Sequence, residues 1–124
     1  MNVHAARRDA DLVVTVHGHL VVGTRRLLHD TVAPLVAEGV HRVVIDFHDT
    51  PYIDSTGLAT LAALARLLGE RGGSLRSVGM VPDLRAACTL AKLDGVVTHH
   101  ATIDAALAEG ASGDRSGIDA VGDA

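Results

Sequence analysis

One short run of residues, at positions 42–47, limits most strongly what this chain can fold into. It reads Arg-Val-Val-Ile-Asp-Phe, and Val43, Val44, Ile45 and Phe47 would place apolar side chains on both faces of a β-strand. A strand that is apolar on both faces has to be covered on both sides. Helical patterns precede and follow this run, so the sequence predicts an α/β domain with a central, buried strand.

Two further strands are expected near the start of the chain. Residues 12–17 are rich in β-branched side chains, which favour a strand, and residues 3–8 are a weaker candidate. A turn at residues 9–11 would join the two as a hairpin, which makes the predicted sheet mixed. Residues 19–22 could continue as a short third strand after a bulge at Gly18.

The remaining elements alternate along the chain. Apolar spacing and end signals predict helices over residues 24–38, 56–70, 83–93 and 102–108, and strands over residues 74–80 and 96–99. Thr24 and Thr102 are expected helix caps, and Gly72-Gly73 and Gly95 are expected stops. Pro34 removes a hydrogen bond to the carbonyl of Asp30, so we expect a kink there or a helix that starts near Asp30.

The end of the chain has a different composition. Beyond residue 109 the sequence consists largely of Gly, Ser, Asp and Ala, and no apolar periodicity survives. Such a segment cannot bury enough apolar surface to order itself. We therefore expect one folded domain over residues 1–109 and a flexible C-terminal tail over residues 110–124.

Charge and composition argue against several classes of function. The formal net charge is −4, and the basic clusters are limited to Arg7-Arg8 and Arg25-Arg26, so nucleic-acid binding is not expected. With one Phe, one Tyr and no Trp, the chain offers few aromatic anchors for a deep ligand pocket. No apolar stretch approaches the roughly 20 residues that a membrane-spanning helix needs, so membrane insertion is not expected.

Cysteine content and the first residues indicate a location. The single cysteine, Cys88, cannot form an internal disulfide, and its place on the apolar stripe of a helix predicts a buried, structural thiol. The first eleven residues carry charges and no long apolar run, unlike a signal peptide. We expect a cytoplasmic protein.

The most informative motif is Asp54-Ser55-Thr56-Gly57, where a polar loop leads from the central strand into a helix. Helix N-termini expose unpaired N–H groups and partial positive charge, so they favour an anion. Either Asp54 or Ser55 could cap the helix. A phosphate on Ser55 would be tolerated by the helix end, although Asp46, Asp49 and Asp54 would repel it. Ser55 can therefore be read as a cap, as an acceptor of phosphate, or as a nucleophile.

Catalytic and metal-binding patterns are weak. A hydrolase elbow, Gly-x-Ser-x-Gly, would need glycine where Ile53 stands, and no phosphate-binding loop of the Gly-x-x-x-x-Gly-Lys-Ser/Thr type is present. Of the eight histidines, His17 with His19 and His99 with His100 lack a recognised metal-ligand spacing. We therefore expect no enzyme activity, no cofactor and no metal, with a serine hydrolase acting through Ser55 as the competing possibility.

The quoted motifs resemble a known family. Residues 43–47, the run Tyr-Ile-Asp-Ser-Thr-Gly-Leu at 52–58, the Leu- and Ala-rich helix and Gly72-Gly73 are similar to the STAS domain of bacterial anti-sigma factor antagonists, also called anti-anti-sigma factors. The resemblance covers roughly residues 3–108. It implies a STAS-type mixed β-sheet of four to five strands with about four helices packed mainly on one side.

The resemblance also implies a function in transcription regulation and stress response. In the family, the serine at the position of Ser55 is phosphorylated by a partner that is both an anti-sigma factor and an ATPase-type serine kinase. The unphosphorylated antagonist binds this partner and frees the sigma factor, phosphorylation ends binding, and a PP2C-type phosphatase restores it. The partner-binding residues implied here are Asp54, Ser55, Thr56, Gly57, His19, Val21 and Asp49.

One departure from the family pattern supports an alternative. Family members usually carry Gly-Glu-Leu-Asp after the second strand, beside the partner-binding surface, whereas this chain has Gly18-His19-Leu20-Val21. Both acidic residues are therefore replaced. The alternative is a STAS subunit without a phosphorylation switch, in a lipid-transport or stressosome-like complex.

Overall fold

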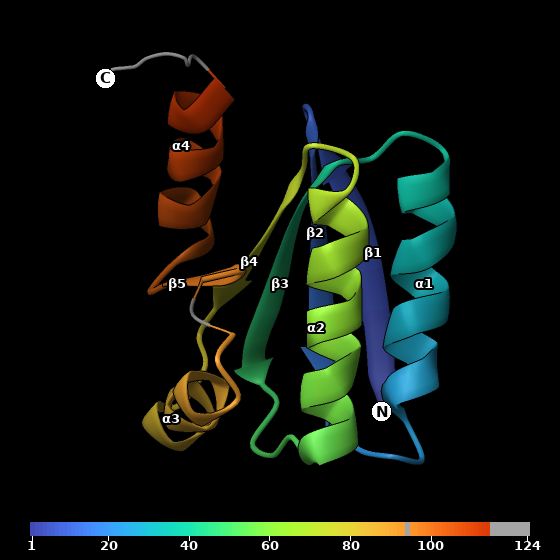
Figure 1. Cartoon of the computed structure of the whole chain (residues 1–124), viewed down its shortest axis with the longest axis vertical. Coiled ribbons are helices and arrows are strands. Elements are labelled where there is room, and N and C mark those ends of the chain that lie inside the picture. Colours follow the sequence, from blue (N-terminus) through green and yellow to red (C-terminus); the bar gives the residue numbers. More distant parts are fainter. Residues whose placement is uncertain (94, 115–124) are drawn as a thin grey trace.

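The structure, a computed structural model, describes residues 1–93 and 95–114 and contains one five-stranded sheet. Its strands are β1 (Asn2–Arg8), β2 (Asp11–His17), β3 (Arg42–Asp49), β4 (Ser74–Val78) and β5 (Val97–His100). They lie side by side in the order β1-β2-β3-β4-β5 (Figure 1). The β1–β2 pair is antiparallel and the other pairs are parallel, which confirms the predicted mixed sheet.

Within the described residues, four helices cover the two faces of this sheet unequally. They are α1 (Arg25–Ala37), α2 (Ser55–Gly69), α3 (Pro82–Leu90) and α4 (Ile103–Asp114). The larger core cluster joins apolar residues of α1, α2 and α3 to one face of the sheet. The smaller cluster joins Ala106 of α4 to Val13, Val44 and Val78 on the other face. The helices thus pack mainly on one side, as the resemblance implies.

The central strand is β3, and it is covered on both faces as its sequence predicts. Val43, Ile45 and Phe47 belong to the large cluster, whereas Val44 belongs to the small one. All four side chains are at most 1% exposed. Each such burial contributes about 1.5–3 kcal/mol relative to an exposed side chain, so this strand is a main source of stability.

Some predicted boundaries are wrong. The short strand expected at residues 19–22 is reduced to a single bridge between Leu20 and Ile53, because the chain turns back at Thr24. Thr24 occupies the predicted N-cap position of α1, but its side chain makes no cap hydrogen bond, because its hydroxyl donates to the His19 carbonyl inside this turn. The helix starts at Arg25 and continues through Pro34, so the later start is not adopted.

Two helix ends also differ from the prediction. α3 ends at Leu90, because Lys92 takes a left-handed conformation (φ 61°) and the Leu93 N–H returns to the Cys88 carbonyl. α4 runs on to Asp114, beyond the predicted end at residue 108. The rest of the expected tail, residues 115–124, lies outside the described residues.

Within the described part of the chain, none of the helices is both long enough and apolar enough to cross a membrane.

Candidate functional site

The candidate site lies at the carboxyl ends of β2 and β3, at the lower end of the molecule in Figure 1. In open sheets with parallel strands, binding sites form at these strand ends. Two loops meet there, residues 18–24 after β2 and residues 50–54 after β3. The Leu20 N–H donates to the Tyr52 carbonyl at 3.0 Å, and the Asp54 N–H donates to the Leu20 carbonyl at 3.1 Å. The two loops therefore form one hydrogen-bonded unit.

Asp54 caps α2 and also holds the neighbouring loop. Its Oδ1 accepts the Gly57 N–H at 2.8 Å and the Thr56 hydroxyl at 2.6 Å, and its Oδ2 accepts the Val22 N–H at 3.0 Å. The hydrogen bond from Thr56 lowers the pKa of Asp54 below its usual value, and the N–H groups of Gly57 and Val22 act in the same direction against partial burial. The carboxylate is therefore held in its charged form.

Gly57 is required by a close approach between α2 and the first loop. A Cβ at this position would lie 2.3 Å from the Leu20 carbonyl oxygen and 2.7 Å from Cγ2 of Ile53. Both distances are too short for any side chain. The first turn of α2 can therefore rest on the loop backbone only because residue 57 is glycine.

Ser55 is the first residue of α2, and its side chain is exposed. The cap is supplied by Asp54 and not by Ser55, which decides between the two capping residues that the sequence offers. Thr56 is half-buried, and its hydroxyl is engaged by Asp54. Of the two adjacent hydroxyls, that of Ser55 is therefore the one open to modification without loss of the cap.

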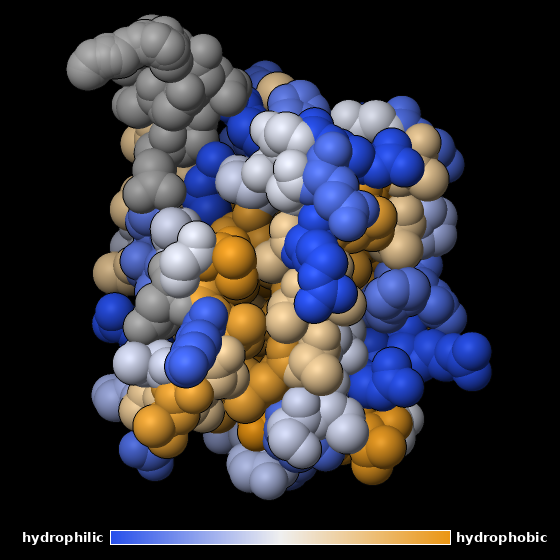
Figure 2. Space-filling view, in the orientation of Figure 1, coloured by the Kyte–Doolittle hydropathy of each residue, from blue (hydrophilic) through white to orange (hydrophobic). Residues whose placement is uncertain are grey.

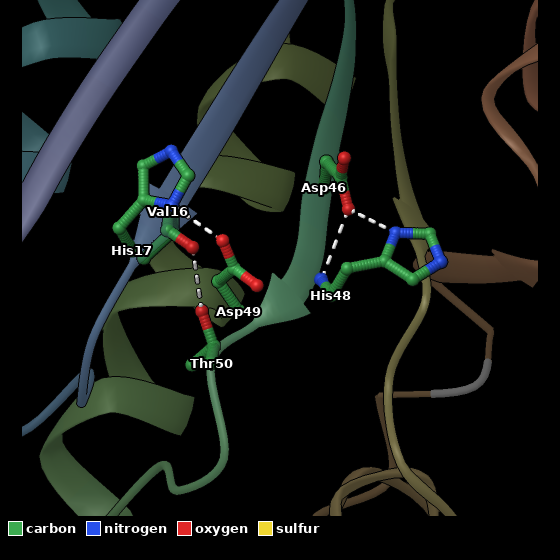
Figure 3. A network of polar contacts seen from close by, with 6 residues as sticks. All are labelled: Val16, His17, Asp46, His48, Asp49 and Thr50. Carbon is green, nitrogen blue, oxygen red and sulfur yellow. Dashed lines mark hydrogen bonds and ion pairs between the residues drawn. The ribbon is translucent and has the colours of Figure 1, made fainter.

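Two of the three acidic residues near Ser55 in the sequence, Asp46 and Asp49, are paired with histidines. His17 Nδ1 lies 2.7 Å from Oδ2 of Asp49, and His48 Nδ1 lies 2.6 Å from Oδ1 of Asp46. Figure 3 shows the two pairs near the end of β3, pointing away from each other. The same strand end is fixed by Thr50, whose hydroxyl donates to the Val16 carbonyl at 3.0 Å. Asp49 thus lies at the site end of the sheet, where it forms an ion pair when His17 is protonated.

The residues that replace the family's acidic pair lie in the first loop. The His19 ring meets the Tyr52 ring edge-on, with ring centroids 6.0 Å apart. Val21 is half-buried, whereas the adjacent Val22 is 68% exposed and Tyr52 is 52% exposed. The sequence prediction named Val21 and missed Val22 and Tyr52 as surface residues. The lone tyrosine just before the motif is the signal that could have indicated Tyr52.

A serine–histidine contact lies elsewhere in the described part of the chain. The Ser77 hydroxyl lies 2.5 Å from His99 Nδ1, but Ser77 is only 1% exposed. Within the same described residues, no group of three His, Cys, Asp or Glu side chains is placed to hold a metal ion. The accessible chemistry at the candidate site is therefore that of an exposed hydroxyl at a helix N-terminus.

Comparison with known proteins finds similarity to STAS domains and to anti-sigma factor antagonists. A family model described as "Mlab, STAS domain" matches residues 3–98. The anti-sigma-B factor antagonist of Bacillus subtilis (strain 168) is 29% identical over 76 residues, which is 61% of this chain and 69% of the relative. A crystal structure of an anti-sigma factor antagonist from Mycobacterium paratuberculosis superposes with a TM-score of 0.79 at 28% identity, covering 89% of this chain and 93% of that one.

The fold is also shared with SpoIIAA of Bacillus, an anti-sigma factor antagonist solved in two states. Its unphosphorylated form matches with a TM-score of 0.72 at 16% identity, covering 87% of this chain and 96% of that chain. Its phosphorylated form matches with a TM-score of 0.71 at 15% identity, covering 87% and 98%. Both states of that protein therefore have the fold described above.

Proposed function

The chain belongs to the STAS domain family, and we propose that within this family it acts as an anti-sigma factor antagonist with Ser55 as its switch. In this proposal the unphosphorylated protein binds an anti-sigma factor that is also an ATPase-type serine kinase, and thereby releases the sigma factor. Phosphorylation of Ser55 ends the binding, and a PP2C-type phosphatase reverses it. Relatives that are named as anti-sigma factor antagonists support the proposal. A protein with this role would act in the cytoplasm.

One observation carries the assignment to Ser55: its side chain is exposed at the first position of α2, while Asp54 supplies the cap. A phosphate would add about −1.5 to −2 charges at this point. The positive end of the helix offsets part of that charge, and no core residue has to move. The fold would remain while the surface offered to a partner changes strongly. That SpoIIAA keeps this fold in its phosphorylated form supports the same expectation.

The test is phosphorylation by an ATPase-type anti-sigma factor from the same organism, with ATP and mapping by mass spectrometry. We expect one phosphate on Ser55 and none on Ser55→Ala. Thr56→Val is the matched control, because it removes the adjacent hydroxyl and leaves Ser55 in place; it should still be modified. Equal modification of Ser55→Ala and the unaltered protein would refute the site.

The proposal makes the protein a regulatory binding module and not an enzyme. Support comes from the burial of Ser77, whose hydroxyl contacts a histidine, and from the exposed position of Ser55 at the start of α2. A fluorophosphonate probe, which labels activated serines, distinguishes the two. Stoichiometric labelling of Ser55 in the folded protein would favour a serine hydrolase.

A second candidate function is a STAS subunit without the switch, in a lipid-transport or stressosome-like complex. It is favoured by the presence of His19 and Val21 where the resemblance implies acidic residues. Affinity purification from native extract separates the candidates. Recovery of a permease with its ATPase supports the second, and recovery of an ATPase-type anti-sigma factor supports the first.

A further inference from the structure

Two adjacent arginines, Arg25 and Arg26, open α1 beside the candidate site. The Arg25 N–H donates to the Val21 carbonyl at 2.8 Å. Val22, which follows Val21, donates its own N–H to Asp54 just before α2. A depression of about 480 Å³ lies at this corner. It is lined by Val22, Gly23, Arg25, Arg26, His29 and Asp30. The start of α1 is therefore part of the same end of the molecule as Ser55.

Arg25 and Arg26 bring two exposed positive charges to this corner, and the carboxylates beside them, Asp30 and Asp54, are both engaged by other groups. Residues 18–24 contain no acidic side chain, and the first one that follows, Asp30, lies 3.9 Å from Arg26 Nε and 3.3 Å from His29 Nδ1. The exposed ion pair between Arg26 and Asp30 contributes little to stability, so the Arg26 guanidinium can still bind a partner. No acidic side chain among the described residues pairs with Arg25. The other carboxylate at the border, Asp54, already accepts three hydrogen bonds.

Exposed apolar groups lie beside these charges. Val22 and Tyr52 are more than half exposed, and Tyr52 is in contact with His19. We call the β2–α1 surface the set made of His19, Val22, Arg25, Arg26, His29 and Tyr52. Figure 2 shows hydrophilic surface over the first half of α1. Tyrosine and arginine around a small apolar centre are the composition enriched in protein–protein contacts.

We infer that the β2–α1 surface binds an acidic segment of the protein partner. This inference rests on the proposed function, because Ser55 at its edge then controls whether the partner stays bound. The partner contributes carboxylates toward Arg25 and Arg26 and an apolar group toward Val22. Phosphorylation of Ser55 would place negative charge beside this surface and repel the same carboxylates.

The chain offers a matched control for the test. Arg7 and Arg8 are also adjacent and exposed, but they lie at the far end of β1, opposite the start of β2. We compare Arg25→Glu/Arg26→Glu with Arg7→Glu/Arg8→Glu in calorimetric titrations of the ATPase-type anti-sigma factor, at low and at physiological salt. The first variant should bind at least about tenfold more weakly and lose much of its salt dependence, whereas the second should stay within about twofold. Equal weakening of both variants, or no weakening of the first, would overturn the inference.

A second measurement separates this inference from the proposed function. If no ATPase-type anti-sigma factor binds the unaltered protein, the proposed function fails. The β2–α1 surface is then tested with a hexaglutamate peptide by NMR titration of the full chain. Amide shifts concentrated in residues 19–29, and absent from Arg25→Glu/Arg26→Glu, support an acidic ligand. Shifts of equal size around Arg7 and Arg8, or no shifts, overturn it.

Discussion

The Asp54 carboxylate accepts the Val22 backbone N–H at 3.0 Å, and this hydrogen bond joins two parts of the chain that lie 32 residues apart. One part is the N-terminus of α2, which carries Ser55, and the other is the loop that leads into α1. The same carboxylate caps α2 through the Gly57 N–H. The cap is therefore also the connection that places Arg25 and Arg26 at the same end of the molecule as Ser55.

Replacing Asp54 should weaken this connection in a graded way. Asp54→Ala removes all three hydrogen bonds that the carboxylate accepts. Helix α2 then loses its cap, and the loop of residues 18–24 loses its hydrogen bond to α2. Asp54→Asn can keep its oxygen on the Gly57 N–H and the Thr56 hydroxyl, but its NH2 group then faces the Val22 N–H, which loses its acceptor. We expect the urea midpoint to fall for both variants, and further for alanine. Faster amide exchange at Val22 in both variants would locate the loss, and unchanged exchange there would contradict the anchoring role.

The same carboxylate should give the protein an acid-dependent component of stability. The pKa of Asp54 is lowered in the folded state from its usual value of 3.8, because the Thr56 hydroxyl and backbone N–H groups bind the charged form. A lowered pKa adds stability above the unfolded value, and that stability is lost as the pH falls through the folded value. The stability difference between the unaltered protein and Asp54→Asn should therefore be constant near neutral pH and shrink below about pH 4. Urea unfolding of both proteins across this pH range measures the stability difference. A difference that grows as the pH falls would contradict a lowered pKa of Asp54 in the folded state.

Gly57 and Gly69 lie on the same helix and should respond to alanine in opposite directions. At position 57 a methyl group would overlap the Leu20 carbonyl, and we expect a loss of about 1–3 kcal/mol. At position 69 nothing lies within 4 Å of the added Cβ, so alanine should gain about 0.5–1 kcal/mol. Chemical denaturation of the two variants tests both signs. A neutral Gly57→Ala would show that α2 does not rest on the loop as described.

The parts of this structure that the sequence predicts correctly are those with local signals. β3 is recognisable because its apolar residues occupy both faces, and α2 because Asp54 and Ser55 are residue types that cap a helix start. The end of α3 was missed because a left-handed stop is usually glycine, and here Lys92 takes that conformation. The prediction placed the stop at the next glycine, Gly95.

The geometry of the site depends on contacts between distant residues, which a single sequence does not reveal. Both Asp54 and Ser55 have side chains that can cap a helix, and in the structure Asp54 caps α2 while its other oxygen accepts the Val22 N–H from the distant loop. Likewise, Val21 and Val22 are chemically identical in the sequence. Only the turn at Thr24, whose hydroxyl accepts the Val21 N–H, leaves Val22 as the exposed one of the two.

The single thiol should be unreactive until the protein opens. Cys88 is fully buried on α3, with its Sγ 3.8 Å from Met80 Sδ. We expect Ellman's reagent to react with the native protein only as fast as α3 opens, and at once in denaturant. Leu90→Cys in a Cys88→Ala background is the control, because Leu90 is 85% exposed on the same helix and its thiol should react immediately. Equal rates for the two proteins would contradict the burial of Cys88.

Negative charge should be tolerated at Ser55 and not at Thr56. Ser55 is exposed at the first position of α2, so the carboxylate of Ser55→Glu meets the positive end of the helix, and the stability should change by no more than about 0.5 kcal/mol. In Thr56→Glu the donor to Asp54 is lost and two carboxylates face each other, so the urea midpoint should fall clearly further. Binding to the anti-sigma factor should nevertheless be lost in Ser55→Glu, whose fold is intact. A Ser55→Glu protein that is stable and binds as tightly as the unaltered one would show that charge at this position does not control the partner.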